Sequence, residues 1–233
     1  MTASSDILLL LAIGAMLPLI TSFPVSLNNT WTDPCLELGD TPPDTVSMLG
    51  MMESLTEDAQ NLYKRAEELM KFYTTVQKDE SQPRVTPSYV NYLEKEKFAN
   101  FPADNEYNSD NLTLVLLNHY KQMSRVAIFC QDAIQIEKTY SHTTNAQGHL
   151  DRLTNVLTSM LCHLDLALKT TGYMVSTFED SNELLDDDAK TLRNKDHHDL
   201  YEYIIFKETY KFASALLAKY SNITKGMGSD KKE

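Results

Sequence analysis

Glycine is scarce in this chain, with only seven glycines among 233 residues. Folds that cradle phosphates in glycine-rich loops, or that wind parallel sheets through tight turns, use more of it. A chain of this length, with 42% hydrophobic residues, can nevertheless bury a sizeable core. The scarcity of glycine therefore favours an all-α fold.

Motifs that carry enzyme chemistry are also missing. The sequence contains no Walker-type loop, no G-x-S-x-G nucleophile elbow and no H-E-x-x-H zinc motif. A metal could bind on a helix face that carries His197, His198 and, one turn beyond His198, Glu202. No matching cluster of ligands is evident nearby. We therefore interpret the two histidines as solvent-exposed. His119 and His163 are interpreted as side chains at the edge of the core. We expect no enzymatic activity, no metal and no cofactor.

Basic residues are too few to balance the acidic ones. Lys and Arg number 21 against 33 Asp and Glu, which gives a net charge of −12. Such a charge argues against nucleic acid or an anionic membrane surface as the main partner. The sequence therefore predicts neither a nucleic-acid partner nor direct membrane insertion.

Only one long apolar run occurs, at residues 7–20, and the small polar pair Thr21-Ser22 follows it. This pattern is typical of a signal peptide over residues 1–22, with a buried N-terminal helix as the alternative. No second run of membrane-spanning length follows, so a soluble, secreted product is expected. The three Asn-x-Thr sequons at Asn28, Asn111 and Asn222 are consistent with that route.

Apolar residues at spacings of three and four predict long helices in one domain over residues 23–225. The clearest stripe lies between Leu150 and Leu168. The predicted helices cover residues of about 44–76, 109–139, 145–171 and 190–222. Asp44 is the predicted N-cap of the first helix, and Ser109 or Asp110 that of the second. A polar, disordered tail is expected at 226–233.

The connections between these helices predict their directions. The polar break between the second and third helices is short and joins antiparallel neighbours, whereas the other two connections are long enough to run back along a helix. The first of them, which includes an apolar-periodic island around residues 89–98, has room for one short helix. The sequence thus predicts a long-chain four-helix bundle, up-up-down-down with two long crossover connections.

Three cysteines in a secreted chain imply one disulfide and one leftover thiol. Cys130 lies on the apolar stripe of the second helix, where a thiol behaves as a small buried hydrophobe. A bridge between Cys35 and Cys162 would pin the N-terminal arm to the third helix. An intermolecular bridge, or a bridge to Cys130, remains open at this point.

Four short motifs resemble the interleukin-6 superfamily of helical cytokines. They are Asp33-Pro-Cys35, Phe101-Pro102, the stretch Asn155-Val-Leu-Thr-Ser-Met-Leu-Cys162, and Tyr210-Lys211 leading into Ala215-Leu-Leu-Ala218. Their order and spacing are similar to the subgroup of leukaemia inhibitory factor, ciliary neurotrophic factor and cardiotrophin-like cytokine. The resemblance implies a Cys35–Cys162 disulfide and a secreted, monomeric ligand of class I cytokine receptor ectodomains, of the glycoprotein-130 and leukaemia-inhibitory-factor-receptor types, that triggers JAK-STAT signalling.

The resemblance also implies two receptor-binding regions. Faces of the first and third helices would bind one receptor chain, and exposed positions there are Gln60, Lys64, Lys71, Arg152, Asn155 and Ser159. The start of the fourth helix with adjoining loops would bind another. There the chain departs from the subgroup, because Phe-x-x-Lys is missing and Leu192 with Lys195 is the nearest match.

Two other classes of helical protein fit the same pattern. An amphipathic lipid carrier could open four such helices onto lipid, although the mixed charges of residues 57–71 are unlike the Lys/Arg border of lipid-binding helices. A hormone of the growth-hormone or prolactin type would share the topology. Cooperative unfolding of the lipid-free monomer would separate the carrier from both kinds of signalling ligand.

Overall fold

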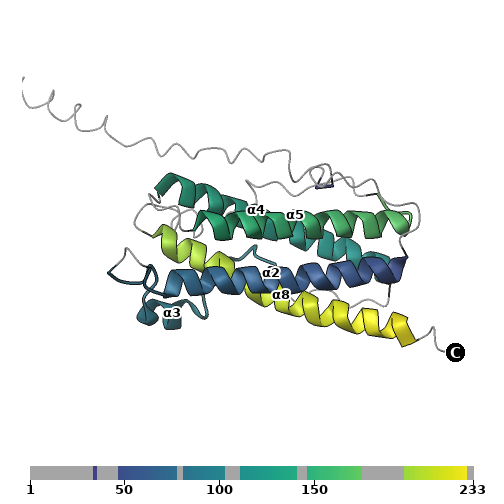
Figure 1. The fold of residues 1–233 in the computed structure, drawn as a ribbon, viewed down its shortest axis with the longest axis horizontal. Helices are drawn as coiled ribbons and strands as arrows, with labels where there is room; N and C mark the ends of the chain where they lie inside the picture. Colours follow the sequence, from purple (N-terminus) through teal and green to yellow (C-terminus); the bar gives the residue numbers. More distant parts are fainter. Residues whose placement is uncertain are drawn as a thin grey trace, which may run out of the picture.

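The computed structural model describes residues 34–35, 47–77, 81–102, 111–140, 146–174 and 197–229. Within these ranges the regular secondary structure is entirely helical (Figure 1), which confirms the all-α prediction. The helices are α2 (Met48–Thr74), α3 (Pro87–Leu93), α4 (Leu112–Tyr140), α5 (Gln147–Thr170) and α8 (His198–Ser229). The predicted leader at 1–22 lies outside the described residues.

Helix α2 is shorter than predicted at both ends. It begins at Met48 because the Ser47 side chain accepts a hydrogen bond from the backbone N–H of Gly50 at 3.2 Å, which makes Ser47 the N-cap. Asp44, the predicted cap, lies outside the described residues. At the other end the Thr75 hydroxyl donates to a carbonyl of the last turn, and Val76, the last residue of the predicted helix, lies beyond it and is 58% exposed.

The connection between α2 and α4 contains the short helix α3, as predicted. Pro87 occupies its first turn, where a missing N–H costs nothing. Its C-terminal end is tied to α8, because the Lys207 ammonium donates to the backbone carbonyls of Leu93, Glu94 and Glu96. Lys207 is only 5% exposed, so this buried cation fixes the position of α3.

Helices α4 and α5 lie close to their predicted bounds. The Asn111 side chain accepts from the Leu114 N–H at 3.3 Å and marks the start of α4, whereas Ser109 and Asp110 lie outside the described residues. Helix α5 ends at Thr170, close to the predicted end at residue 171, and Gly172 just beyond it has a φ of 79° that suits glycine. Bonds from the N–H groups of Gly172 and Tyr173 back to the last turn complete a Schellman motif.

Helix α8 extends seven residues further than the predicted end at residue 222. The disordered tail predicted from Gly226 is therefore wrong for residues 226–229, which are helical. Ile223 and Met227, four residues apart, pack against the core and continue the apolar stripe past the point where the glycines suggested an end. The predicted residues 190–196 and 230–233 lie outside the described part of the chain.

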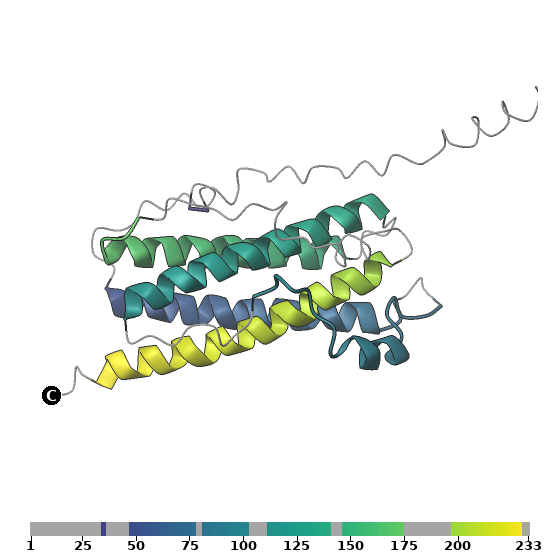
Figure 2. The ribbon, with the colours of Figure 1, turned by 180° about the vertical axis from the view of Figure 1, so that it is seen from behind.

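The core lies where the four long helices pack side by side (Figures 1 and 2). Helix α2 packs against α8 and α5, and α4 packs against the same two helices. Most apolar residues that recur at spacings of three and four along these helices are buried, whereas Leu112, Tyr210 and Leu217 are half-buried. The fully buried stripe residues include Leu55, Leu62, Leu69, Tyr73, Leu116, Met123, Val126, Leu153, Leu157, Met160, Leu164, Leu168, Phe206 and Tyr220.

Candidate functional site

The outer side of α2 presents three of the residues predicted to bind a receptor. Gln60, Lys64 and Lys71 are all exposed. The apolar stripe of α2 packs against α5 and α8, so the opposite side of the helix, which carries these three residues, faces solvent. Lys71 forms an ion pair with Glu67 at 3.0 Å, one turn earlier on the same helix. Gln60 and Lys64 are thus the residues of this set that project from the middle of α2.

The exposed side of α5 presents two of its three predicted residues. Arg152 and Asn155 are exposed, but Ser159 is half-buried. The Ser159 hydroxyl donates to Asp58 Oδ1 of α2 at 3.0 Å, and His163 Nδ1 lies 2.6 Å from Asp58 Oδ2. The prediction that Ser159 is exposed is therefore wrong, and its hydroxyl instead holds α5 against α2.

Charged residues bring these two sets together along the border between α2 and α5. Glu68 of α2 accepts from Arg65 at 2.8 and 2.9 Å and lies 3.8 Å from His149 of α5. The Arg65 hydrogen bond lowers the pKa of Glu68 despite partial burial, and the electrostatic interactions of Glu68 with Arg65, His149 and Arg152 act in the same direction. Arg152 therefore lies near the turn of α2 that follows Lys64. Leu192 and Lys195, the other predicted pair, lie outside the described residues.

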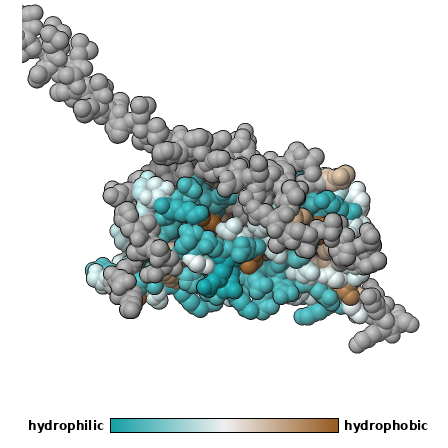
Figure 3. Space-filling view, turned by 45° about the horizontal axis from the view of Figure 1, so that its top comes forward, coloured by the Kyte–Doolittle hydropathy of each residue, from teal (hydrophilic) through white to brown (hydrophobic). Residues whose placement is uncertain are grey.

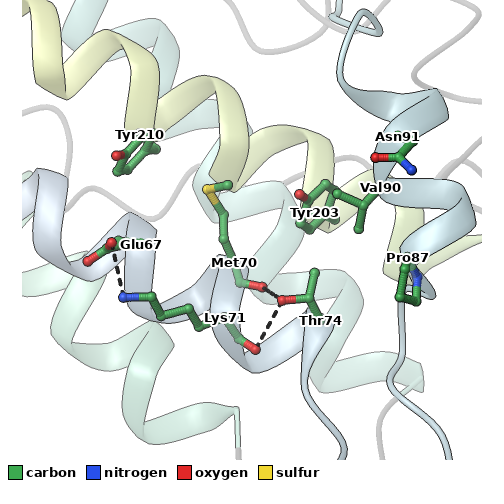
Figure 4. Close-up of a pocket in the computed structure, with 9 residues that line it drawn as sticks. All are labelled: Glu67, Met70, Lys71, Thr74, Pro87, Val90, Asn91, Tyr203 and Tyr210. Carbon is green, nitrogen blue, oxygen red and sulfur yellow. Dashed lines mark hydrogen bonds and ion pairs between the residues drawn. The ribbon is translucent and has the colours of Figure 1, made fainter.

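A groove that the sequence did not predict opens between α2, α3 and α8 (Figure 4). Its volume is about 460 Å³. The lining residues are Glu67, Met70, Lys71, Thr74, Pro87, Val90, Asn91, Tyr203 and Tyr210. Two further aromatic residues of α3, Tyr89 and Tyr92, are 52% and 68% exposed. Their spacing of three on a helix that begins with proline was the available signal in the sequence.

A buried ion pair lies near the start of α8. Arg84 Nη1 donates to both carboxylate oxygens of Glu137, at 2.9 and 3.0 Å, and lies 3.6 Å from Asp199 Oδ1. The guanidinium also lies over the rings of Phe72 and Tyr73, at 5.1 and 5.4 Å. Burial opposes the charged form, but the Glu137 carboxylate outweighs it and raises the pKa of Arg84 above its usual value.

One of the two histidines interpreted as exposed, His198, belongs to this buried region together with Glu202. His198 is 16% exposed at its side chain, and Glu202 is completely buried, where it accepts a hydrogen bond from the Tyr73 hydroxyl. Burial, with the nearby charge of Glu137, raises the pKa of the Glu202 carboxyl well above its usual range. The exposed interpretation holds for His197 but is wrong for His198, whose ring packs against Tyr140 of α4.

The same region contains possible metal ligands. Atoms of Glu137, His198 and Asp199 lie within 4.8 Å of one another. The Arg84 guanidinium already contacts both Glu137 and Asp199, so a positive charge is supplied where a cation would bind. We interpret this cluster as structural.

A second buried polar contact joins α4 to α8. His119 Nδ1 lies 2.9 Å from the Tyr220 hydroxyl, and both side chains are buried. Burial, with a smaller contribution from the charge of Lys219, lowers the pKa of His119 to about 4. His119 is therefore neutral in the folded protein at pH 7, and its burial agrees with its interpretation as a side chain of the core.

His119 should make stability depend on pH. Its folded pKa of about 4 lies below the ordinary value of 6.5, so the unfolded chain binds the extra proton first as pH falls. The folding stability that comes from keeping His119 neutral is fully present above pH 6.5. It is lost as the pH falls from 6.5 to 4, by about 3 kcal/mol in total. His119→Gln, which can still bond Tyr220 without titrating, should lose less stability than the native chain when urea unfolding is compared at pH 7 and pH 4. Equal losses in both proteins would contradict this assignment.

The three cysteines form the bridge and the buried free thiol that the sequence favoured. Cys35 and Cys162 form a disulfide with a sulfur–sulfur distance of 2.10 Å, which ties the residues before α2 to α5. Cys130 is buried and free, and its Sγ lies 3.5 Å from the Thr209 hydroxyl. Burial raises the pKa of the Cys130 thiol to about 12, so it remains a thiol and is not a candidate nucleophile.

Two of the three sequons fall within the described residues. Asn111 and Asn222 are exposed, the first at the start of α4 and the second on α8, so a glycan on either could project into solvent. Asn28 lies outside the described part of the chain. Glycosylation at all three sites stays a prediction.

None of the helices in the described ranges is both long and apolar enough to span a bilayer. In Figure 3 the coloured residues of the visible face are mainly hydrophilic, with small separate hydrophobic spots. On this face, hydrophilic residues thus cover the packed apolar stripes.

No family model, curated protein or solved structure matches this chain.

Proposed function

We propose that this chain is a secreted helical cytokine that binds class I receptor ectodomains and brings receptor chains of the glycoprotein-130 and leukaemia-inhibitory-factor-receptor types together, which triggers JAK-STAT signalling. The observation that carries the proposal is a set of exposed polar residues on two adjacent, rigid helices, α2 and α5. The disulfide that ties the residues before α2 to α5 adds to it. The described residues suit binding better than chemistry, because their ionisable clusters are buried and paired.

The topology proposed is the up-up-down-down bundle. It is supported by the connections, which are short between Tyr140 and Gln147 but long between Thr74 and Leu112 and between Thr170 and His198. In Figure 1 α3 follows α2 at the left, whereas α8 runs to the C terminus at the right, so the neighbours α2 and α8 are antiparallel. Helical cytokines and growth hormones use this arrangement.

The first receptor contact is proposed on the α2–α5 face, defined by Gln60, Lys64, Arg152 and Asn155. These side chains are exposed and belong to helices that Asp58 joins through Ser159 and His163. Rigid helices lose little conformational freedom on binding, so a few well-placed anchors can supply most of the affinity. Its positive charges, Lys64 and Arg152, suit an acidic receptor surface.

The second contact is proposed at the groove between α2, α3 and α8. It lies beside the first half of α8, where the resemblance places another receptor chain, and it offers Met70, Val90 and Tyr203 for an apolar anchor of the receptor. The exposed Tyr89 and Tyr92 of α3 supply aromatic contact area in a chain that lacks Phe-x-x-Lys.

The proposal is tested with the purified, folded protein and soluble receptor ectodomains of both types, separately and together. Saturable binding and a ternary complex are the expected results. Reversing two charges with Lys64→Glu and Arg152→Glu should weaken one of the binary affinities tenfold or more, equivalent to about 1.4 kcal/mol.

The matched control reverses two exposed lysines of α4, Lys121→Glu and Lys138→Glu, which gives the same change in net charge away from the α2–α5 face. Its receptor affinity should stay within about twofold of the native value, since mutated charges outside a contact act mainly through weak long-range steering. Equal affinities for the two double variants would refute the α2–α5 face. No binding of a cooperatively folded native chain to either ectodomain would refute the cytokine proposal itself.

A further inference from the structure

Tyr63 of α2 and Tyr210 of α8 form an unusually close aromatic pair. Their ring centroids lie 4.4 Å apart with an angle of 32° between the ring planes, and their hydroxyl oxygens are 2.5 Å apart. Both side chains are half-buried, and Tyr210 lines the groove shown in Figure 4. The pair therefore joins two helices at a place that solvent can reach.

The contact between the hydroxyls also brings reactive carbons together. In a phenol, the ring carbons next to the hydroxyl-bearing carbon are the positions at which an oxidised ring forms a new carbon–carbon bond. Each such carbon is only two bonds from its hydroxyl oxygen, so hydroxyl oxygens 2.5 Å apart keep the reactive edges of the two rings in the same contact. The centroid separation of 4.4 Å is close to that of two directly bonded six-membered rings, so coupling requires rotation of the side chains with little movement of the helices.

We propose that Tyr63 and Tyr210 are a site of oxidative modification, at which a haem peroxidase and hydrogen peroxide generate an intramolecular dityrosine link between α2 and α8. Each phenol loses one electron and one proton to the peroxidase, and the two phenoxyl radicals join through their ortho carbons. Each ring then moves its ortho hydrogen to its oxygen, which restores both phenols. The balance is two tyrosines and one hydrogen peroxide giving one dityrosine and two water molecules.

The fold favours this coupling over reaction between molecules. Helices α2 and α8 hold the rings in contact, so the second radical has its partner at a high effective concentration. The hydrogen bond with Tyr63, together with burial, raises the pKa of Tyr210, so that this residue is a neutral phenol at physiological pH and each oxidation removes a hydrogen atom in total. The link would close a loop between residues 147 positions apart, and a cross-link of that span stabilises mainly by restricting the unfolded chain.

The test treats the folded, full-length monomer with a haem peroxidase and hydrogen peroxide. The expected product is a monomer lighter by two hydrogen atoms, with dityrosine fluorescence and a proteolytic cross-linked peptide that contains Tyr63 and Tyr210. This peptide mapping is done on the native chain, so its result does not depend on whether any variant folds. A cross-link that maps to other tyrosines, or a treated monomer with no loss of mass, would overturn the proposal.

Phenylalanine variants sharpen the test. Tyr63→Phe and Tyr210→Phe should each abolish the lighter monomer, because a single phenoxyl radical has no adjacent phenol. Tyr89→Phe and Tyr92→Phe remove exposed tyrosines of α3 and serve as matched controls, in which the lighter monomer should persist and only covalent dimers should decrease. Loss of the lighter monomer in the α3 variants instead would count against the pair. The chemistry is independent of receptor binding, so the cytokine proposal and this one can fail separately.

Discussion

Replacing Arg84 with methionine is expected to lower the free energy of unfolding by about 3–5 kcal/mol, because the Glu137 carboxylate would be left buried without its partner. The side chains of Arg84 and Glu137 are 9% and 4% exposed, so water cannot replace the lost bonds. The variant also loses the contact of the guanidinium with the rings of Phe72 and Tyr73. Urea unfolding at pH 7 measures the change.

The double variant Arg84→Met with Glu137→Met is the informative control. Apolar replacement of both partners of a buried ion pair is often neutral, so the double variant should recover most of the lost stability. The coupling between the two sites is read from the complete mutant cycle. Arg65→Met, which breaks the more exposed pair with Glu68, should cost no more than about 1 kcal/mol. A loss from Arg84→Met no larger than that from Arg65→Met would contradict the assigned role.

Removal of the Cys35–Cys162 disulfide should have an effect of similar size. The bridge joins residues 127 positions apart, and the chain-entropy model assigns about 5 kcal/mol to closing a loop of that length. The double variant Cys35→Ser with Cys162→Ser should therefore unfold at a much lower urea concentration than the native chain. The expected cause is the greater conformational freedom of the unfolded chain. The folded state should change little, because buried residues along the whole of α5 hold this helix in the core independently of the bridge.

Reduction provides the matched control for the disulfide. Dithiothreitol should destabilise the native chain to the level of the double serine variant and leave that variant unchanged, since Cys130 is buried and unpaired. If the reductant changes the stability of both proteins equally, the bridge is not the cause.

The helical core could be predicted because its information is local. Spacings of three and four place Leu55, Leu62 and Leu69 on one side of α2, and the same rule identified the stripe of α5. Gly172 marked the end of α5 for the equally local reason that glycine tolerates a positive φ. The position of Cys130 on a core stripe favoured the pairing of Cys35 with Cys162 without excluding other bridges, and the family resemblance implied the same pairing.

The buried charges could not be predicted, because their partners are distant in sequence. Sequence patterns assign Arg84, Glu137 and Glu202 to the surface, where such residues usually lie. Their burial depends on the path of the connection after α2, which brings Arg84 next to α4. The groove was missed for a related reason: its outer wall, α3, is positioned by the Lys207 ammonium, a contact across more than 110 residues.

Polar pairs recur along the contact between α2 and α8, and they specify its register. Thr56 faces Thr224, Tyr63 faces Tyr210, and Tyr73 faces Glu202, so the partner numbers fall as those on α2 rise. A slide of α8 by one helical turn, about 5.4 Å, would separate all three pairs at once. Reversal of its direction would do the same. Leucine and alanine alone could pack in several alignments, and these polar contacts select the antiparallel alignment in which the side of α2 that we propose for receptor binding and the groove beside α3 exist together.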